Sequence, residues 1–192
     1  MKKVILFLAD GFEEIEALTV VDVLRRAGIG CDTVSISEDL EVNGAHNIKV
    51  IADIKASDVK SKYDGVILPG GMPGTRNLQS STCVLNTLKQ YYEDGRLIGA
   101  ICAAPIVLSS AGIVKGRKVT SYPGFEKELK EVCYIEEIVV KDDNIITSRG
   151  AGTAFDFAVA IMNYLGYEKQ GKELKSSMIY HLSLIHISEP TR

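Results

Sequence analysis

Short apolar runs, rich in β-branched residues, alternate along this chain with segments whose apolar residues recur at helical spacing. A short, continuous apolar run is typical of a strand that is covered on both faces of a sheet. Strands that alternate with helices form βαβ units, which build parallel sheets. The sequence therefore predicts an α/β fold, with a mostly parallel sheet and helices on both of its faces.

The expected elements run from residue 4 to residue 165. We expect strands at 4–8, 31–36, 65–68, 97–101, 119–121, 138–140 and 145–147, and a hairpin at 42–51 with Asn43-Gly44 as its turn signal. We expect helices at 14–26, 82–92, 103–111 and 153–165. Ligands of such sheets sit beyond the carboxyl ends of the strands, which directs attention to residues 10–16, 69–74 and 102–105.

The length and composition fit one globular domain at residues 1–180. The chain has 192 residues, of which 46% are apolar and 24% charged, and no linker or repeat interrupts the pattern. Residues 181–192 show neither a helical nor a strand-like pattern, and they resemble translated sequencing-adapter read-through. We therefore expect a non-native tail there; a genuine short tail is the alternative.

Charge and hydropathy exclude two classes of partner. A formal net charge of -3 gives no reason to expect nucleic acid, and no run of 18 apolar residues exists that could span a membrane. The first apolar run follows two lysines, but Asp10 and Glu13 come soon after it and no cleavage site does. We therefore expect a buried first strand and a cytoplasmic protein.

The cysteines and histidines predict neither a disulfide framework nor a metal site. Cys31, Cys83, Cys102 and Cys133 lie far apart without a C-x-x-C spacing. The three histidines, at positions 46, 181 and 186, form no ligand spacing with them. We interpret Cys31, Cys83 and Cys133 as buried, inert thiols.

Cys102 differs because it ends an apolar strand and precedes a helix. That is the position of a nucleophile elbow, a crowded turn that needs small neighbours such as Ala103. The start of a helix offers N–H groups and a positive dipole end, both of which lower a thiol pKa. The sequence therefore predicts an exposed, largely deprotonated thiol at Cys102; a buried, inert cysteine is the alternative.

Two further positions suggest partners for this thiol. Gly71 follows the strand at 65–68, so its N–H and that of Ala103 could form an oxyanion hole, whereas a plain tight turn is the alternative. Glu16 is expected on the same helix face as Ile15, Val20 and Val23, where an acidic residue suggests a specific partner. Glu13 and Glu14 fit solvated carboxylates at a helix start better.

Five motifs in order resemble the ThiJ/PfpI superfamily, in particular the branch of the Parkinson-disease-associated protein deglycase. They are DGFEEIEA, VDVLRRAG, ILPGGMPG, AICAAP and TSRGAGTAFDFA, and the likeness runs from about residue 2 to residue 177. The resemblance implies a flavodoxin-like three-layer sandwich, a homodimer and no cofactor. It also implies that Cys102 is the nucleophile, Glu16 its carboxyl partner, and Gly71 and Ala103 the oxyanion donors.

One departure from that family bears on the mechanism. Members of the branch often place a histidine where this chain has Tyr122, a candidate pocket residue, so a triad with histidine is not expected and Glu16 must carry any acid–base step. The leading hypothesis is a glyoxalase or protein deglycase acting on methylglyoxal or its adducts. The alternatives are a redox sensor or redox-regulated chaperone that uses the same cysteine, and, behind both, a cysteine peptidase or amidase.

Overall fold

A central sheet organises the chain in the computed structural model, which describes residues 1–59 and 63–180. The tail expected at 181–192 lies outside the described residues. Within them the main sheet has seven strands in the order β10-β11-β7-β6-β1-β2-β5. Their bounds are β1 (Lys3–Leu8), β2 (Gly30–Ser35), β5 (Ile54–Lys55), β6 (Gly65–Leu68), β7 (Leu97–Ile101), β10 (Val139–Asp142) and β11 (Ile145–Ser148).

The pairing of the strands confirms a mostly parallel sheet. β1 lies at the centre and pairs in parallel with β2 on one side and with β6 on the other. β6 continues to β7 and β7 to β11, again in parallel. Among the described strands of this sheet only β10 runs antiparallel, against β11. Because β1 and β6 are neighbours that lead to opposite sides of the sheet, the topological switch point lies between them.

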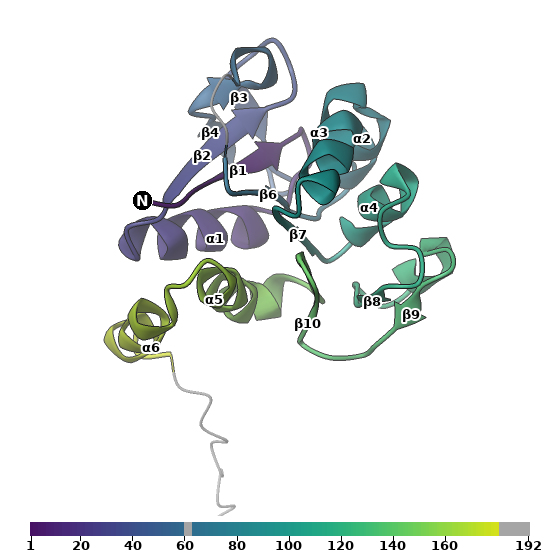
Figure 1. Cartoon of the computed structure of the whole chain (residues 1–192). Coiled ribbons are helices and arrows are strands. Elements are labelled where there is room, and N and C mark those ends of the chain that lie inside the picture. Colours follow the sequence, from purple (N-terminus) through teal and green to yellow (C-terminus); the bar gives the residue numbers. More distant parts are fainter. Residues whose placement is uncertain (60–62, 181–192) are drawn as a thin grey trace, which may run out of the picture.

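Helices cover both faces of the sheet and complete the expected three-layer sandwich (Figure 1). One layer holds α1 (Glu14–Arg26), α5 (Ala154–Tyr164) and α6 (Glu168–Ser177). The other holds α2 (Gly74–Ser80), α3 (Thr82–Glu93) and α4 (Pro105–Ala111). Each layer has its own apolar core: Leu24 and Phe157 are fully buried on one side of the sheet, and Leu88 and Leu108 on the other.

Several local expectations are corrected. Ile15 is 55% exposed, so the buried face of α1 does not include it and instead carries Glu16, Val20 and Val23. The hairpin at 42–51 exists as β3 (Glu41–Asn43) and β4 (Lys49–Ile51), but Asn43 pairs with Lys49, so the turn is a longer loop than a two-residue Asn-Gly turn. The helices α2 and α6 were not predicted.

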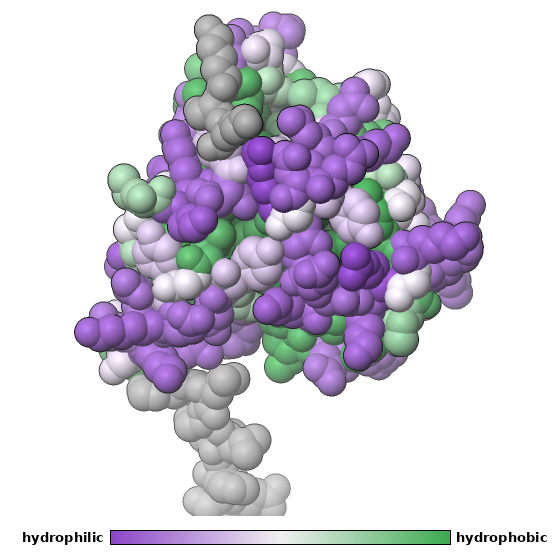
Figure 2. All heavy atoms as spheres, in the orientation of Figure 1, coloured by the Kyte–Doolittle hydropathy of each residue, from purple (hydrophilic) through white to green (hydrophobic). Residues whose placement is uncertain are grey.

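The remaining elements are short. They are η1 (Ala56–Asp58), β8 (Lys118–Val119), η2 (Phe125–Glu128), β9 (Cys133–Tyr134) and η3 (Ala151–Thr153). In the part of the chain that the structure describes, no helix combines the length and the apolar character that crossing a bilayer requires. Figure 2 shows one face of the molecule, on which hydrophilic side chains dominate and apolar ones form smaller patches between them. The cytoplasmic location stays a prediction.

Candidate active site

Cys102 occupies a sharp turn directly after β7. Its φ is 64, a left-handed conformation that costs a non-glycine residue about 1–3 kcal/mol and that occurs preferentially at functional sites. Two backbone hydrogen bonds hold this turn: Cys102 N donates to Ser148 O at 3.0 Å, and Cys102 O accepts from Tyr122 N at 2.9 Å. The sharp strand-to-helix turn predicted here is present, although α4 begins only at Pro105 rather than at Ala103.

Glu16 reaches Cys102 from α1. The residue is only 1% exposed, and its carboxyl group hydrogen bonds with the Cys102 side chain. Its Oε2 also accepts a hydrogen bond of 2.7 Å from Gly70 N. A side chain on Gly70 would force Glu16 and Cys102 to shift, because a Cβ there would lie 2.7 Å from both Glu16 Oε2 and Cys102 Cβ. Glycine at this position thus allows the thiol and the carboxyl group to meet.

Two backbone N–H groups point at the sulfur. Those of Ala103 and Gly71 both donate hydrogen bonds to the Cys102 side chain. They come from the turns after β7 and β6, two neighbouring strands whose carboxyl ends meet at the same edge of the sheet. An anion at the sulfur, or at an oxygen bonded next to it, would be stabilised by both donors. The structure thus brings together the four residues that the sequence proposed.

The pKa values of Glu16 and Cys102 correct the expected protonation state of the thiol. Burial raises the pKa of Glu16 to about 7, and the charge of Glu13 acts in the same direction. Burial also raises the pKa of Cys102 to about 12, with the charge and hydrogen bond of Glu16 next in importance and the N–H groups of Ala103 and Gly71 opposing them. The expectation of an exposed thiol with a lowered pKa is therefore wrong, because the turn is half-buried and faces a carboxyl group.

The two groups act as one acid that loses its first proton near neutral pH. Within the described residues Glu16 Oε1 is buried and has no hydrogen-bond partner, which penalises a charge on the carboxylate. The sulfur, in contrast, has two N–H donors. Because the pKa of Glu16 is about 7 and that of Cys102 about 12, the first proton leaves Glu16 and the thiol stays protonated. Glu16 as carboxylate is then placed to accept the thiol proton when the sulfur reacts.

The raised pKa of Glu16 makes stability depend on pH. The folded-state pKa of about 7 exceeds the usual 4.5, so the contribution of Glu16 is fully present below about pH 4.5 and is lost as the pH rises through about 7. We expect the free energy of unfolding to fall by roughly 2–3 kcal/mol between pH 5 and pH 8 through this group. Urea unfolding across this range should show the fall in the wild type and a flatter profile in Glu16→Gln. Equal slopes in both proteins would contradict the assignment.

A cavity of about 300 Å³ opens onto this pair. Tyr122, which is 50% exposed, stands at its rim, as expected of a pocket residue. The sequence did not single out the other lining side chains, although three of them lie within the quoted motifs. They are Glu13, Met72, Phe125 and Ala151. The lining thus combines apolar side chains with the carboxyl groups of Glu13 and Glu16.

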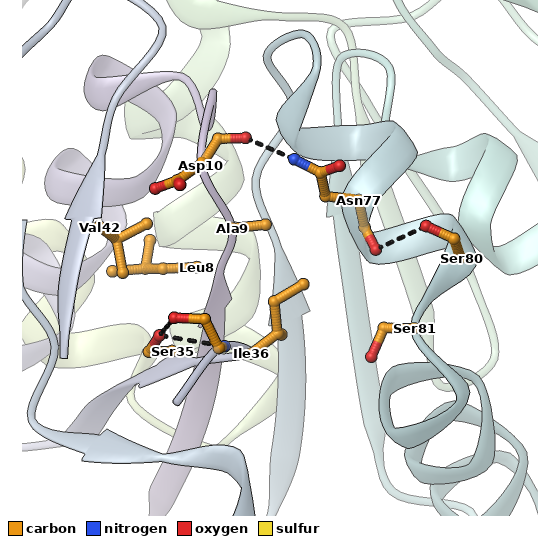
Figure 3. Close-up of a pocket in the computed structure, with 10 residues that line it drawn as sticks. Leu8, Ala9, Asp10, Ser35, Ile36, Val42, Asn77, Ser80 and Ser81 are labelled. Carbon is orange, nitrogen blue, oxygen red and sulfur yellow. Dashed lines mark hydrogen bonds between the residues drawn. The ribbon is translucent and has the colours of Figure 1, made fainter. Parts of the chain in front are cut away.

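A larger cavity, of about 400 Å³, lies beyond the ends of β1 and β2 and contains neither Cys102 nor Glu16. Figure 3 shows that several of its polar groups are paired with each other; the Asn77 amide, for example, donates to Asp10 O at 2.9 Å. The hydroxyl groups of Ser35 and Ser37 pair at 3.0 Å. A hollow whose polar groups bond among themselves offers few free groups to orient a substrate. The smaller cavity is therefore the candidate active site.

Other expectations about titratable residues are revised. Cys31 is buried, as expected, but Cys83 and Cys133 are exposed, and all four cysteines are free. Glu13 and Glu14 are not solvated: their side chains are 16% and 6% exposed. His46 is the histidine within the described residues, and it bonds to Glu14 rather than to Cys102, so no triad forms there.

Comparison with known proteins gives one consistent family. The model of the DJ-1/PfpI family matches residues 2–164. Protein DJ-1alpha of Drosophila melanogaster is 39% identical over 183 residues, 93% of this chain and 84% of that protein. A Caenorhabditis elegans protein named glutathione-independent glyoxalase DJR-1.2 is 38% identical over 174 residues, 89% of this chain and 92% of its own length.

Some relatives are longer than this chain. Protein DJ-1 homolog B of Arabidopsis thaliana is 37% identical over 174 residues, and the match covers 90% of this chain but 40% of that protein. Solved structures agree with the fold. The crystal structure of Drosophila melanogaster DJ-1beta has a TM-score of 0.90 at 36% identity and covers 93% of this chain and 97% of its own. A structure of oxidized Toxoplasma gondii DJ-1 has a TM-score of 0.90 at 34% identity, with coverages of 94% and 99%.

Proposed function

The chain belongs to the DJ-1/PfpI family, and on this premise we propose that it is a cofactor-independent enzyme that converts small 2-oxoaldehydes, such as methylglyoxal, to hydroxy acids. One observation carries the proposal: a buried carboxyl group hydrogen bonded to a thiol whose sulfur also receives two N–H groups. A relative named as a glutathione-independent glyoxalase supports it. Adducts of the same aldehyde on proteins, the substrates of a deglycase, are the second substrate class.

The first step is addition of the sulfur to the aldehyde carbon. As the S–C bond forms, the thiol proton passes to Glu16 and then to the aldehyde oxygen, which gives a hemithioacetal. The N–H groups of Gly71 and Ala103 stabilise the negative charge while it resides on oxygen. Because the carboxyl group already bonds with the thiol, this transfer needs no rearrangement of the site.

The second step moves a proton between the two carbons of the substrate. Glu16 as carboxylate removes the proton from the former aldehyde carbon and returns it to the neighbouring carbon, while the hydroxyl proton passes to the other oxygen. The product is a thioester of lactate on Cys102. Water hydrolyses this thioester and regenerates the thiol, so the balance is methylglyoxal plus water to lactate.

Lactate formation tests this proposal. Purified protein would be incubated with methylglyoxal without thiols or glutathione, and lactate measured by chiral chromatography with bovine serum albumin as the protein control. A single lactate enantiomer formed over many turnovers would support a chiral site. Consumption of the aldehyde without lactate would refute it. The same assay with a methylglyoxal-modified peptide distinguishes the deglycase reaction from the glyoxalase reaction.

Oxidation of Cys102 is a second candidate function. The same two N–H groups would stabilise a sulfinate, which forms when hydrogen peroxide oxidises the thiolate and is reduced to water. A related structure from Toxoplasma gondii is described as oxidized. Intact-mass measurement after mild peroxide tests this role. Addition of two oxygen atoms at Cys102, ahead of the exposed Cys83 and Cys133, would favour it, and oxidation at those two sites first would contradict it.

We further propose that the chain forms a homodimer through α1 and the β3–β4 hairpin. These elements adjoin, since Ala45 N donates to Phe12 O at 2.8 Å, and together they expose Ile15, Ile48 and Ile51. We expect a dimer in sedimentation velocity, and a shift toward monomer in Ile51→Lys because a charge in an apolar interface costs several kcal/mol. The control is Ile138→Lys, at an isoleucine that is 51% exposed elsewhere on the chain. A monomeric wild type would contradict the proposal.

A further inference from the structure

Three potential metal ligands converge beside the candidate active site. The cluster consists of Glu13 and Glu14 at the start of α1 and His46 in the β3–β4 loop, and one ligand atom from each lies within 4.8 Å of the other two. His46 Nδ1 is 2.8 Å from Glu14 Oε2 and 3.8 Å from Glu13 Oε2. Two ligands bound tetrahedrally to zinc at about 2.1 Å are separated by about 3.4 Å, a value between these two distances.

The fold holds the buried member of this cluster in place. Glu14 Oε1 accepts a hydrogen bond of 2.8 Å from His46 N, so its Oε2 is left to face the imidazole. Gly44 packs directly on this carboxyl group: a Cβ there would lie 2.7 Å from Glu14 Cγ. The backbone of Glu13 is fixed as well, because its N–H donates to Gly70 O at 2.9 Å. Ligands held by such supporting bonds form a pre-organised site.

The charges of the cluster favour a cation. Two carboxylates face one imidazole, so the group is doubly negative when His46 is neutral and still negative when it is protonated. The carboxylates are largely withdrawn from water, while the His46 side chain is 67% exposed in the single chain. Imidazole nitrogen with carboxylate oxygen is a donor set that suits zinc and similar transition metals better than magnesium or calcium.

We propose that Glu13, Glu14 and His46 form a binding site for a divalent transition-metal ion of the zinc class, at the edge of the candidate active-site cavity. Glu13 lines that cavity, so the ion would lie beside the reactive pair without using Cys102 or Glu16 as a ligand. Three protein ligands leave the fourth tetrahedral position open to water or to a substrate oxygen. The sequence did not predict a metal site, because His46 lies 32 residues from Glu14 and only the fold brings them together.

An ion pair between His46 and the two glutamates is the competing explanation, and one variant separates the two. His46→Arg keeps the positive charge and the ion pair but cannot ligate a metal, because arginine does not lose its proton. Glu13→Gln removes a ligand while leaving the hydrogen bonds of Glu14 intact. Cys102→Ser and the double change His181→Ala with His186→Ala are the controls, since they remove other potential ligands and should leave this site unchanged.

The experiment uses Co²⁺ and Zn²⁺ on the full-length chain. Titration with Co²⁺ should give one ion per chain and visible absorption typical of four- or five-coordinate cobalt, and Zn²⁺ should displace it. We expect Zn²⁺ affinity, measured by competition with a chromophoric chelator, to fall at least about 100-fold in both His46→Arg and Glu13→Gln, beyond the range of changes outside the ligand set. Both controls should match the wild type.

Three results would overturn the site. They are binding in His46→Arg equal to that of the wild type, a thiolate-to-cobalt charge-transfer band that disappears in Cys102→Ser, and the absence of stoichiometric binding. The first would leave only an ion pair at His46, and the second would assign the ion to the sulfur. The circular dichroism spectrum of each variant verifies that it folds, and Glu13→Gln decides the question if His46→Arg does not.

Discussion

Cys102→Ala is expected to lower lactate formation from methylglyoxal by at least about 10⁴-fold. The alanine removes the only atom that forms a covalent bond with the substrate in the proposed reaction, and loss of a covalent nucleophile has effects of this order. The fold should survive, because the side chain shrinks by one atom and the backbone bonds to Ser148 and Tyr122 remain. Steady-state lactate production at saturating aldehyde, with near-ultraviolet circular dichroism as the check on folding, measures the effect.

Matched variants make the interpretation specific to this thiol. Cys83→Ala and Cys133→Ala remove exposed thiols and should retain full activity. Glu16→Gln keeps the size of the side chain but cannot carry a proton, so its activity should fall by about 100-fold or more while the enzyme stays folded. If Cys102→Ala kept most of its activity, or if Cys83→Ala lost it, the proposed nucleophile would be wrong.

The fold follows from the sequence to a large extent because burial of short apolar strands is a local property. Residues 4–8 and 97–101 are apolar throughout. Such a short, continuous apolar run is typical of a strand that is covered on both faces. The helix α6, in contrast, is almost entirely polar, with Leu174 as its one large apolar residue, so only its packing against α5 reveals it. Ile15 was misassigned for a related reason: helical spacing cannot tell an internal apolar face from an exposed one.

The sequence predicted which residues lie together in the candidate site, but it did not predict the pKa of the Cys102 thiol. The turn at Cys102 and the glycines after β6 have sequence signatures, and the positive φ of Cys102 agrees with them. The pKa of the thiol has no such signature, because it depends on how deeply the turn is buried and on a carboxyl group 86 positions away in the chain, Glu16. The burial of Glu14 likewise results from the β3–β4 hairpin folding over α1.

Gly71→Ala is expected to have the largest effect on stability of any conservative change in the site. Gly71 has a φ of 90, and a Cβ there would lie 2.5 Å from Gly11 O and 2.7 Å from Phe12 C. Both atoms belong to the backbone, so neither can rotate away as a flexible side chain would. We expect the free energy of unfolding to fall by at least about 4 kcal/mol, the range reserved for severe disruption, as measured by urea unfolding.

Gly95→Ala is the control that separates the energetic cost of the steric clash from the cost of the positive φ. Gly95 also has a positive φ, of 65, but a Cβ there would meet nothing within 4 Å. Gly95→Ala should therefore lose only about 1–2 kcal/mol, the cost of the left-handed conformation alone. If Gly71→Ala were no more destabilising than Gly95→Ala, the turn after β6 could move away from β1, and its N–H would not be held against the sulfur. The oxyanion site requires the rigid turn, so Gly71→Ala should lower activity and stability together. Cys102→Ala, in contrast, should lower activity and leave the fold intact.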